Sequence, residues 1–415
     1  MTRLGDTFIQ QLHDRGEDMT NKYAFAELAD KSKDGIPQEF PIPIGLTKSK
    51  ELGIRNVIIE MDLAYFDYDY GKWTEEQIWD LMRKRIEWTR NNIFEGAMIY
   101  FNLRDFSDCM QKAPERLLKV VQFLSAYRPT ISGLMYEDLG GTFPEELGVY
   151  TRAVRNLMTI NGWKDANLLI HMHYQWGLSN ASNIECLANG ANGMWAGICE
   201  EGAAMGHSST NLAIYNLIRM GNTKVVKKFN CQALRNAAIA VTKIVTGKLP
   251  PAKTPVVGER ALDRVFGFPA FEPENMGGFS LQDFLGEEAP IRISTMADNK
   301  MIRQALINNF GTDPQFTLDM GTKMKELMLD DMRSNRKEEY QSTFGLSVLF
   351  DRAGGQLTEA MSEVIAKVRY NISLLLLLYF LRETFLKSKT ILNDVKYRYF
   401  HILILINNPT PLISL

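Results

Sequence analysis

The chain has few cysteines and almost no net charge, and each scarcity excludes a class of protein. Four cysteines in 415 residues, none in a Cys-x-x-Cys pair, are too few for a disulfide framework. They are Cys109, Cys186, Cys199 and Cys231. The 47 basic and 49 acidic side chains nearly cancel, so no long-range field draws in nucleic acid or an anionic membrane. The N-terminus also lacks the apolar segment of a secretory signal, and we expect a cytoplasmic protein.

Long hydrophobic runs are scarce too. The run Ile372–Leu381 is ten residues long and ends at Arg382, whereas a membrane-spanning helix needs about 20 apolar residues. We therefore do not expect a membrane anchor. The run lies in a tail, residues 371–415, that contains no Gly, Ala, Met, Gln, Trp or Cys. This composition suggests sequence that was not selected as protein, and we expect the tail to lie outside the fold.

The part of the chain between residues 40 and 221 alternates short β-rich runs with longer helical patterns. Such alternation is typical of βαβ units around a parallel sheet, either an eight-stranded barrel or an open doubly wound sheet. The predicted strands are Phe40–Ile44, Asn56–Met61, Ala97–Asn102, Ile131–Tyr136, Asn167–His171 and Gly193–Ala196. The predicted helices between them are Thr74–Asn91, Pro114–Tyr127, Pro144–Asn161 and Leu178–Asn189.

A proline-rich stretch, Leu249–Pro255, interrupts this alternation and predicts a linker. Helical patterns at Thr317–Arg336 and Gln356–Arg369 follow it. We therefore expect three parts: an α/β domain over residues 1–248, a linker with a mostly helical subdomain over residues 249–370, and the atypical tail.

Histidine is rare in this sequence, and the clustering of three histidines indicates a functional site. Only five occur, and His171, His173 and His207 lie within 37 residues of one another. His171 and His173 end an apolar run that predicts a buried strand. Residues i and i+2 of a strand point to the same face, so this pair presents two imidazoles side by side, as two positions on a metal ion require. The alternative is a pair of hydrogen-bonded histidines that line a pocket without a metal.

The sequence around the histidines resembles the DRE-TIM metallolyases, the family with the HMG-CoA lyase-like (pyruvate carboxyltransferase) domain. The similar segments are His171–Ala181, Gly190–Gly202 and Gly206–Leu212. The resemblance implies a TIM (β/α)8-type barrel and a metal-dependent carbon–carbon lyase or synthase. Its substrate would be a 2-oxo acid or a 3-hydroxyacyl or acyl-CoA compound, its cofactor Mg, Mn or Zn, and its assembly a homodimer.

The resemblance also implies roles for particular residues. His171 and His173 match the family's two histidine ligands, and Asn211 matches the asparagine that completes the metal shell, although it could instead cap a helix. Our candidates for moving a proton are His207 first and Glu201 second, and His207 could instead substitute as a metal ligand. Asp138 would lie at the barrel mouth, where it could orient a ligand or cap a helix. Cys199 lies about two positions before the place of the lyases' catalytic cysteine, and we favour a packing role for it.

The sequence departs from the family in two places. No Arg-Asp-Gly motif of the family's first strand precedes Phe40, and Gln175 stands where an acidic or amide residue is expected. The chain would then lack its first strand or strands, or have lost part of its site. The alternative function is a catalytically inactive barrel with a binding or regulatory role. A biotin-dependent carboxyltransferase is a third possibility, but it needs a lysine on a strand, and the predicted strands have none.

Overall fold

The structure is a computed structural model that describes residues 3–139, 141–202, 205–263, 285–287, 289–336 and 340–387. The chain divides into two compact units. Unit 1 comprises Met1–Leu262 and Gly277–Glu287, and unit 2 comprises Asp263–Met276 and Glu288–Leu415. Each unit is described by itself.

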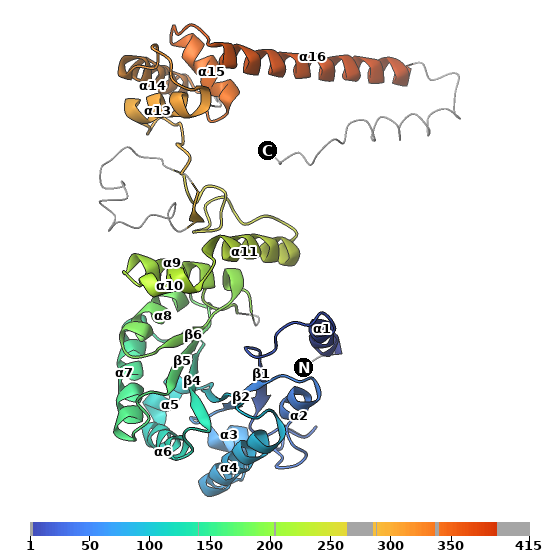
Figure 1. The fold of residues 1–415 in the computed structure, drawn as a ribbon, viewed down its shortest axis with the longest axis vertical. Coiled ribbons are helices and arrows are strands. Elements are labelled where there is room, and N and C mark those ends of the chain that lie inside the picture. Colours follow the sequence, from blue (N-terminus) through green and yellow to red (C-terminus); the bar gives the residue numbers. More distant parts are fainter. Residues whose placement is uncertain are drawn as a thin grey trace. The chain divides into compact units, whose positions relative to one another are not determined.

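Unit 1 is built on a six-stranded parallel sheet whose strands follow one another in chain order (Figure 1). The strands are β1 (Tyr23–Glu27), β2 (Asn56–Met61), β3 (Ile99–Leu103), β4 (Ile131–Asp138), β5 (Asn167–Met172) and β6 (Gly193–Trp195). A parallel sheet in sequential order needs a crossover after every strand, and helices supply these crossovers. The predicted α/β class is thereby confirmed.

The first predicted strand, Phe40–Ile44, is wrong. Residues 40–43 form irregular backbone, and helix α2 (Ile44–Glu51) begins at the last residue of the predicted strand. Pro41 and Pro43 have no N–H to give to a ladder, which explains why this segment does not pair. The strand series instead starts at β1, which pairs with β2 from Tyr23 opposite Asn56 to Glu27 opposite Glu60.

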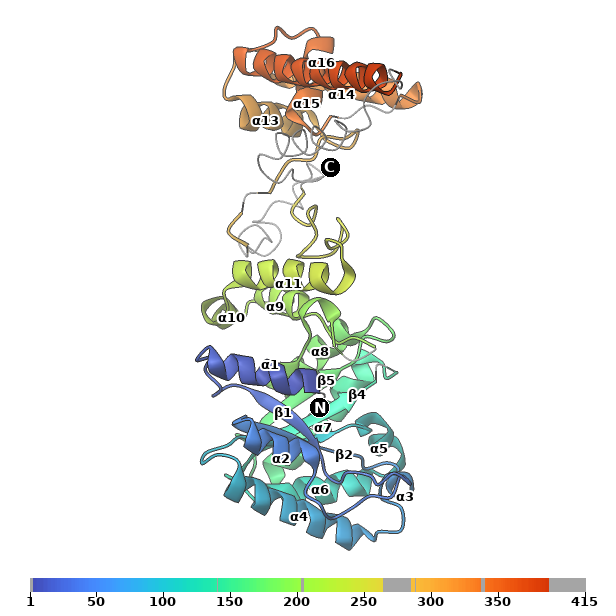
Figure 2. The same ribbon diagram turned by 90° about the vertical axis from the view of Figure 1, so that its right-hand side faces the viewer.

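Helices cover the outer face of the sheet (Figures 1 and 2). They are α2, α3 (Phe66–Tyr70), α4 (Glu75–Asn92), α5 (Phe106–Lys112), α6 (Pro114–Ser125), α7 (Pro144–Ile160) and α8 (Ser179–Ala188), with α1 (Arg3–Asp14) before the sheet. The capping box predicted at the start of α4 is present, since Thr74 and Gln77 bond reciprocally. The main hydrophobic core lies between this helical layer and the strands.

The sheet curls until side chains of its first and last strands meet on its inner face. A separate cluster there contains Ile58, Tyr100 and Met135. The ring of Phe25 on β1 lies 4.9 Å, edge to face, from that of Trp195 on β6. Because β1 and β6 are the first and last strands of the sheet order, their contact shows that the sheet is strongly curled, as in an α/β barrel. Six strands make up this sheet in the described part of the chain.

The chain leaves the sheet through a short turn and three helices. These are η1 (Ile198–Glu200), α9 (Thr210–Arg219), α10 (Thr223–Lys228) and α11 (Cys231–Thr246). Their apolar side chains form a cluster of their own, which includes Ile214 and Ile218 of α9 and Ala238 of α11. This cluster anchors the loop that follows β6, which carries one of the three histidines.

Unit 2 is helical, as predicted. It contains α13 (Asn299–Phe310), α14 (Leu318–Arg333), α15 (Thr343–Arg352) and α16 (Glu359–Lys387) around a core with Ile302, Met324 and Phe350. Helix α16 runs on past residue 370, so the first part of the atypical tail is helical. The rest of the tail, residues 388–415, lies outside the described residues.

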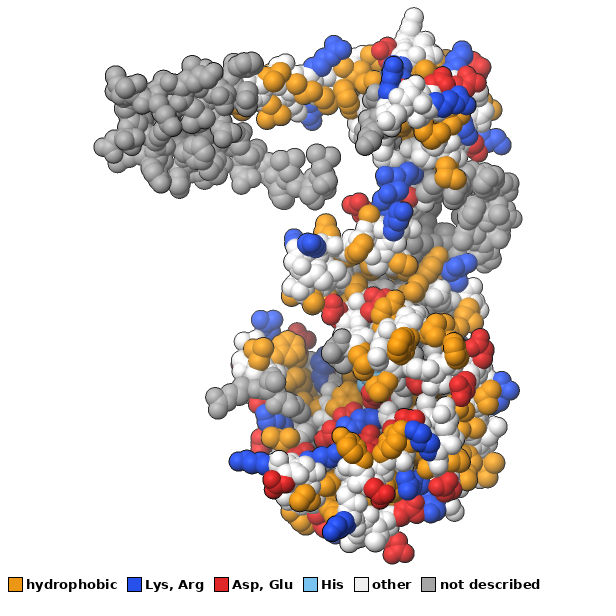
Figure 3. Space-filling model, turned by 180° about the vertical axis from the view of Figure 1, so that it is seen from behind, with side chains coloured by type: hydrophobic (Ala, Val, Ile, Leu, Met, Phe, Trp, Pro, Cys, Tyr) orange, Lys and Arg blue, Asp and Glu red, His pale blue; other side chains and the backbone are white. Residues whose placement is uncertain are grey.

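The continuation of α16 exposes apolar side chains (Figure 3). Tyr370 and Leu375 are 69% and 66% exposed. Of the helices in the described segments, none is both long enough and apolar enough to cross a membrane.

Candidate metal centre

Polar side chains lie on the inner face of the sheet at the carboxyl ends of its strands. Side chains alternate along a strand, so positions two residues beyond the inner apolar cluster point to the same face. On β2 and β3 these positions hold Glu60 and Asn102, two residues after Ile58 and Tyr100. On β4 the position holds Glu137, two residues after Met135. The carboxyl ends of parallel strands are where α/β barrels carry their active sites.

Three buried imidazoles meet at this end of the sheet. The ring centroids of His171, His173 and His207 form a nearly equilateral triangle with sides of 4.9, 4.8 and 4.7 Å. One ring nitrogen from each lies within 4.8 Å of the other two. The Nε2 atoms of His171 and His207 are 2.8 Å apart. The structure thus brings together the two predicted metal ligands and the first predicted proton-transfer residue.

Backbone hydrogen bonds position His207 beside β5. The loop after β6 forms an antiparallel bridge in which His207 lies opposite His173. The N–H of Tyr174 donates to the carbonyl of Gly206, at 3.1 Å, and the N–H of His207 donates to that of Glu200, at 2.9 Å. Since these bonds do not involve side chains, the loop conformation itself sets the direction of the imidazole.

Glu137 holds two of the histidines in place. Its Oε1 lies 2.8 Å from Nε2 of His173, and its Oε2 accepts a hydrogen bond of 2.9 Å from the amide of Asn102. Nδ1 of His171 is 3.5 Å from Oε2 without making a hydrogen bond. Burial opposes ionisation, but the bonds from His173 and Asn102 and the nearby His171 lower the pKa of Glu137 below its ordinary value. The carboxylate is therefore ionised at neutral pH.

His171 and His207 are neutral at the same pH. Burial, the largest cause, and the neighbouring rings of His207 and His173 lower the pKa of His171 to about 4, against the pull of Glu137. Burial and His173 also lower the pKa of His207. Neutral imidazoles carry a free lone pair, which is the form that binds a metal. The Nδ1 atoms of His171 and His173 are buried and have no hydrogen-bond partner among the described residues.

A second charged group adjoins the first. Arg104, just beyond β3, bonds to Asp62 through two nitrogens and to Glu27 at 2.9 Å. Glu60 accepts a 3.2 Å hydrogen bond from the Asn102 amide that also serves Glu137. Burial raises the pKa of Glu60 to about 7, although Arg104 opposes the shift. Three carboxyl groups, those of Asp62, Glu27 and Glu60, thus act on one guanidinium, which favours binding of a cation.

The other predicted site residues lie elsewhere. The carboxylate of Asp138 accepts hydrogen bonds from Ser107 at 2.6 Å and Thr142 at 2.7 Å. As the neighbour of Glu137 on β4, Asp138 points to the opposite face of the sheet. Glu201 approaches His207 with its backbone carbonyl, 3.5 Å from Nδ1, and no contact of its carboxylate with the ring is found among the described residues.

Asn211 and Cys199 belong to the segment after β6. Asn211 is buried in the first turn of α9, and both polar atoms of its amide lack a hydrogen-bond partner in the described part of the chain. The cap of α9 is Ser209, so the helix-cap alternative for Asn211 is wrong. The thiol of Cys199 lies 3.3 Å from the carbonyl of Ala238 on α11, and burial raises its pKa. This environment suits a packing role.

Sequence reasoning missed Glu137, Glu60, Asn102 and Arg104. The sequence does contain a signal for such residues, namely polar side chains at alternate positions within apolar strands. Burying these side chains is costly unless they pair with one another. Glu60 and Asn102 both lie inside strands that were predicted. Their partners come from other strands, however, and only the curled sheet identifies them.

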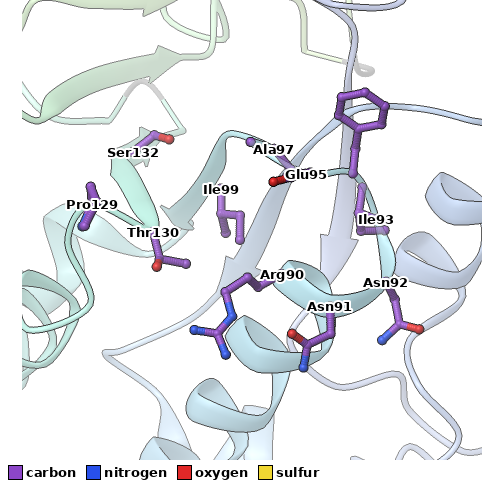
Figure 4. Close-up of a pocket in the computed structure, with 12 residues that line it drawn as sticks. Arg90, Asn91, Asn92, Ile93, Glu95, Ala97, Ile99, Pro129, Thr130 and Ser132 are labelled. Carbon is purple, nitrogen blue, oxygen red and sulfur yellow. The ribbon is translucent and has the colours of Figure 1, made fainter.

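Two further features fall outside this group. A pocket of about 490 Å³ lies at the amino ends of the strands, where Ile99 begins β3 and Arg90 lies in the last turn of α4 (Figure 4). It is at the end of the sheet opposite the histidines. A cluster of Asp62, Asp69 and Asp105 could also approach a cation, but Asp62 pairs with Arg104, and Asp105 accepts backbone hydrogen bonds.

Comparisons with known proteins concern the fold. No family model matches the sequence. The solved structures that resemble the chain include HMG-CoA lyases. That of Brucella melitensis is 16% identical with a TM-score of 0.40, over 49% of this chain and 71% of its own. That of Pseudomonas aeruginosa is 15% identical with a TM-score of 0.38, over 49% and 67%.

A pyruvate carboxylase domain also resembles the chain. The carboxyl transferase domain of the Rhizobium etli enzyme, solved with pyruvate, is 10% identical with a TM-score of 0.36, over 76% of this chain and 48% of its own. The described strands β1 to β6 contain no lysine, in agreement with the sequence-based expectation. What the site does is therefore argued from its own residues.

Proposed function

We propose that the protein is a metal-dependent lyase or synthase that breaks or forms a carbon–carbon bond in a 2-oxo acid or an acyl-CoA compound. The observation that carries the proposal is the group of three buried imidazoles beside an ionised carboxylate at the carboxyl ends of parallel strands. Such a group is costly to bury unless it has a ligand to hold.

The residues present fit a divalent cation. His171 and His173 would hold it, because their rings lie side by side and buried, with Nε2 of His171 directed toward His207 and Nδ1 of His173 without a hydrogen-bond partner among the described residues. Glu137 accepts a hydrogen bond from the Nε2–H of His173, which fixes the tautomer of the ring and leaves Nδ1 with its lone pair. Asn211 is the predicted amide ligand, and its buried, unpaired amide is available for that role. A bound ion would act as a Lewis acid on the substrate's carbonyl group.

Glu60 is the residue best suited to move the proton. A group with a pKa near the working pH can both accept and return a proton, and the pKa of Glu60 is about 7. Neither Glu201, which approaches His207 through its backbone, nor Asp138, which faces the other side of the sheet, has comparable access. The amide of Asn102 contacts both Glu60 and Glu137, so it orients the proton carrier relative to the histidines.

The test measures metal content and activity on the full chain. Protein loaded with manganese or zinc is assayed for cleavage of HMG-CoA and for condensation of acetyl-CoA with pyruvate and other 2-oxo acids. We expect one equivalent of metal, and turnover that a His171→Ala, His173→Ala double variant abolishes together with the metal. His13→Gln is the matched control, since the His13 side chain bonds to the Leu52 carbonyl, at 2.6 Å, and is not part of the three-histidine group. Absence of bound metal with both manganese and zinc would instead favour an inactive barrel with a binding role.

A further inference from the structure

The third imidazole has no role in the proposal above. His207 is 7% exposed, and its Nε2 lies 2.8 Å from Nε2 of His171. Two neutral imidazole nitrogens that face each other at this distance must share a proton or a cation, since otherwise their lone pairs repel. The ring of His173 completes the triangle at 4.7 Å from that of His207.

We infer that His207 is a third imidazole ligand of the metal, and that the three imidazole nitrogens make the site select zinc and similar transition metals over magnesium. The inference rests on the proposed function only for the presence of a metal at His171 and His173. It assigns His207 to the metal rather than to proton transfer, the role that the sequence suggested first.

The chemistry of the donors supports this selectivity. Imidazole nitrogen suits zinc, copper, iron and nickel, whereas magnesium and manganese prefer oxygen ligands. The nearest carboxylate, Glu137, is already bonded to His173 and Asn102 and serves to orient a ligand. Three imidazole nitrogens are also a ligand set of catalytic zinc sites.

The loop that carries His207 is built for this placement. Gly202 has φ +127, and a Cβ atom there would lie 2.1 Å from Nδ1 of the His207 ring. Only glycine permits both the backbone conformation and the approach of the ring. Nδ1 of His207 therefore faces the loop, near the carbonyl of Glu201, while Nε2 faces the other histidines. A proton-transfer group would instead need its free nitrogen to face a substrate.

Competition between metals on the full chain tests the inference. Chelator-treated protein is titrated with Co²⁺, followed by its visible absorption, and zinc and magnesium are then added as competitors. We expect zinc to displace Co²⁺ and magnesium to fail at concentrations at least about 100-fold higher. His207→Ala should weaken zinc binding by about 10- to 100-fold or more, since even partners of metal ligands contribute that much.

A charge-changing variant gives a second readout. His207→Asp replaces a nitrogen by a carboxylate oxygen, so it should retain a bound metal while narrowing the preference for zinc over magnesium. Two controls should bind as the unchanged protein does: His13→Gln, outside the site, and Asp69→Asn, in the aspartate cluster. Circular dichroism establishes that each variant is folded. Should His207→Ala not fold, the competition on the unchanged protein still decides the selectivity.

The possible outcomes separate the two proposals. Equal affinity for zinc and magnesium, or zinc binding unchanged in His207→Ala, would overturn the inference and leave the lyase proposal standing. Tight zinc binding that requires all three histidines, with no turnover of any acid or thioester, would overturn the lyase proposal and leave the inference intact. Absence of any bound metal would overturn both.

Discussion

The ionisation of Glu60 should determine how the activity varies with pH. As a base Glu60 must be ionised, and its pKa is about 7 because it is buried. We expect kcat/KM to fall about tenfold for each pH unit below 7, and Glu60→Gln to remove most of the activity at every pH while leaving the metal bound. The measurement is a pH–rate profile of the metal-loaded protein with its metal content determined in parallel.

Glu201→Gln is the comparison for that experiment. The sequence nominated Glu201 for the same step, but it approaches the site through its backbone carbonyl. We expect its variant to keep the profile of the unchanged protein. A profile that loses its acidic limb in Glu201→Gln, and keeps it in Glu60→Gln, would reverse the two assignments.

Residue types and spacing alone located the histidines. His171 and His173 were predicted from the alternation of a strand, and the structure places them on one face of it. Their anchor, Glu137, was not predicted, although its neighbour Asp138 was. A shift of one residue along a strand turns a side chain to the other face, so the choice between the two carboxylates required the register of β4.

At the scale of elements, the loop between β6 and α9 decides whether the third histidine reaches the site. Gly202→Ala should push the His207 ring away, because the new methyl group would overlap Nδ1 and the φ of +127 is strained for alanine. We expect zinc affinity to fall by about as much as in His207→Ala, about 10- to 100-fold. Gly221→Ala also places alanine at a positive φ but meets nothing within 4 Å, so it serves as the control. Equal zinc affinity in the two variants would contradict this role of the loop.

The beginning of the sheet shows where element prediction failed. Phe40–Ile44 has β-rich letters, yet two prolines remove ladder donors and the segment leads into α2. The true first strand, β1, has the sequence Tyr-Ala-Phe-Ala-Glu, whose alanines are poor strand formers. Its pairing with β2 along five residues overrides that local preference.

At the scale of the whole molecule, the two units provide independent probes of stability. In unit 2, Asp331 is buried with a side chain 3% exposed, and it pairs with Arg352 through two bonds of 2.7 Å and with Tyr340 at 2.7 Å. Asp331→Asn removes the negative charge that pairs with Arg352. Removing one member of a buried pair costs about 3–5 kcal/mol, so we expect the helices of unit 2 to unfold at lower denaturant concentration.

Tryptophan fluorescence separates this effect from unit 1. All six tryptophans lie in unit 1: Trp73, Trp79, Trp88, Trp163, Trp176 and Trp195. Asp331→Asn should therefore shift the helical signal in circular dichroism while the fluorescence transition and metal binding stay unchanged. The hydrogen bond from Arg352 is the largest cause that lowers the pKa of Asp331 to about 2. The stabilisation that Asp331 contributes is therefore present above the ordinary pKa of an aspartate and is lost as the pH falls toward 2. A simultaneous shift of both signals would show that the units unfold together.

The sequence by itself determined the α/β class, most strands, the helical end of the chain and the three histidines, because these follow from local periodicity and from rare residue types. Only the tertiary structure decided the start of the sheet and the partners of the histidines. Glu137, Asn102 and Glu60 lie on three different strands, and their contact arises from the curl and register of the sheet. The approach of His207 likewise depends on a glycine five residues away in the same loop. Such long-range and shape-dependent contacts leave no local sequence pattern, because each of these residue types is also common in strands and loops that carry no site.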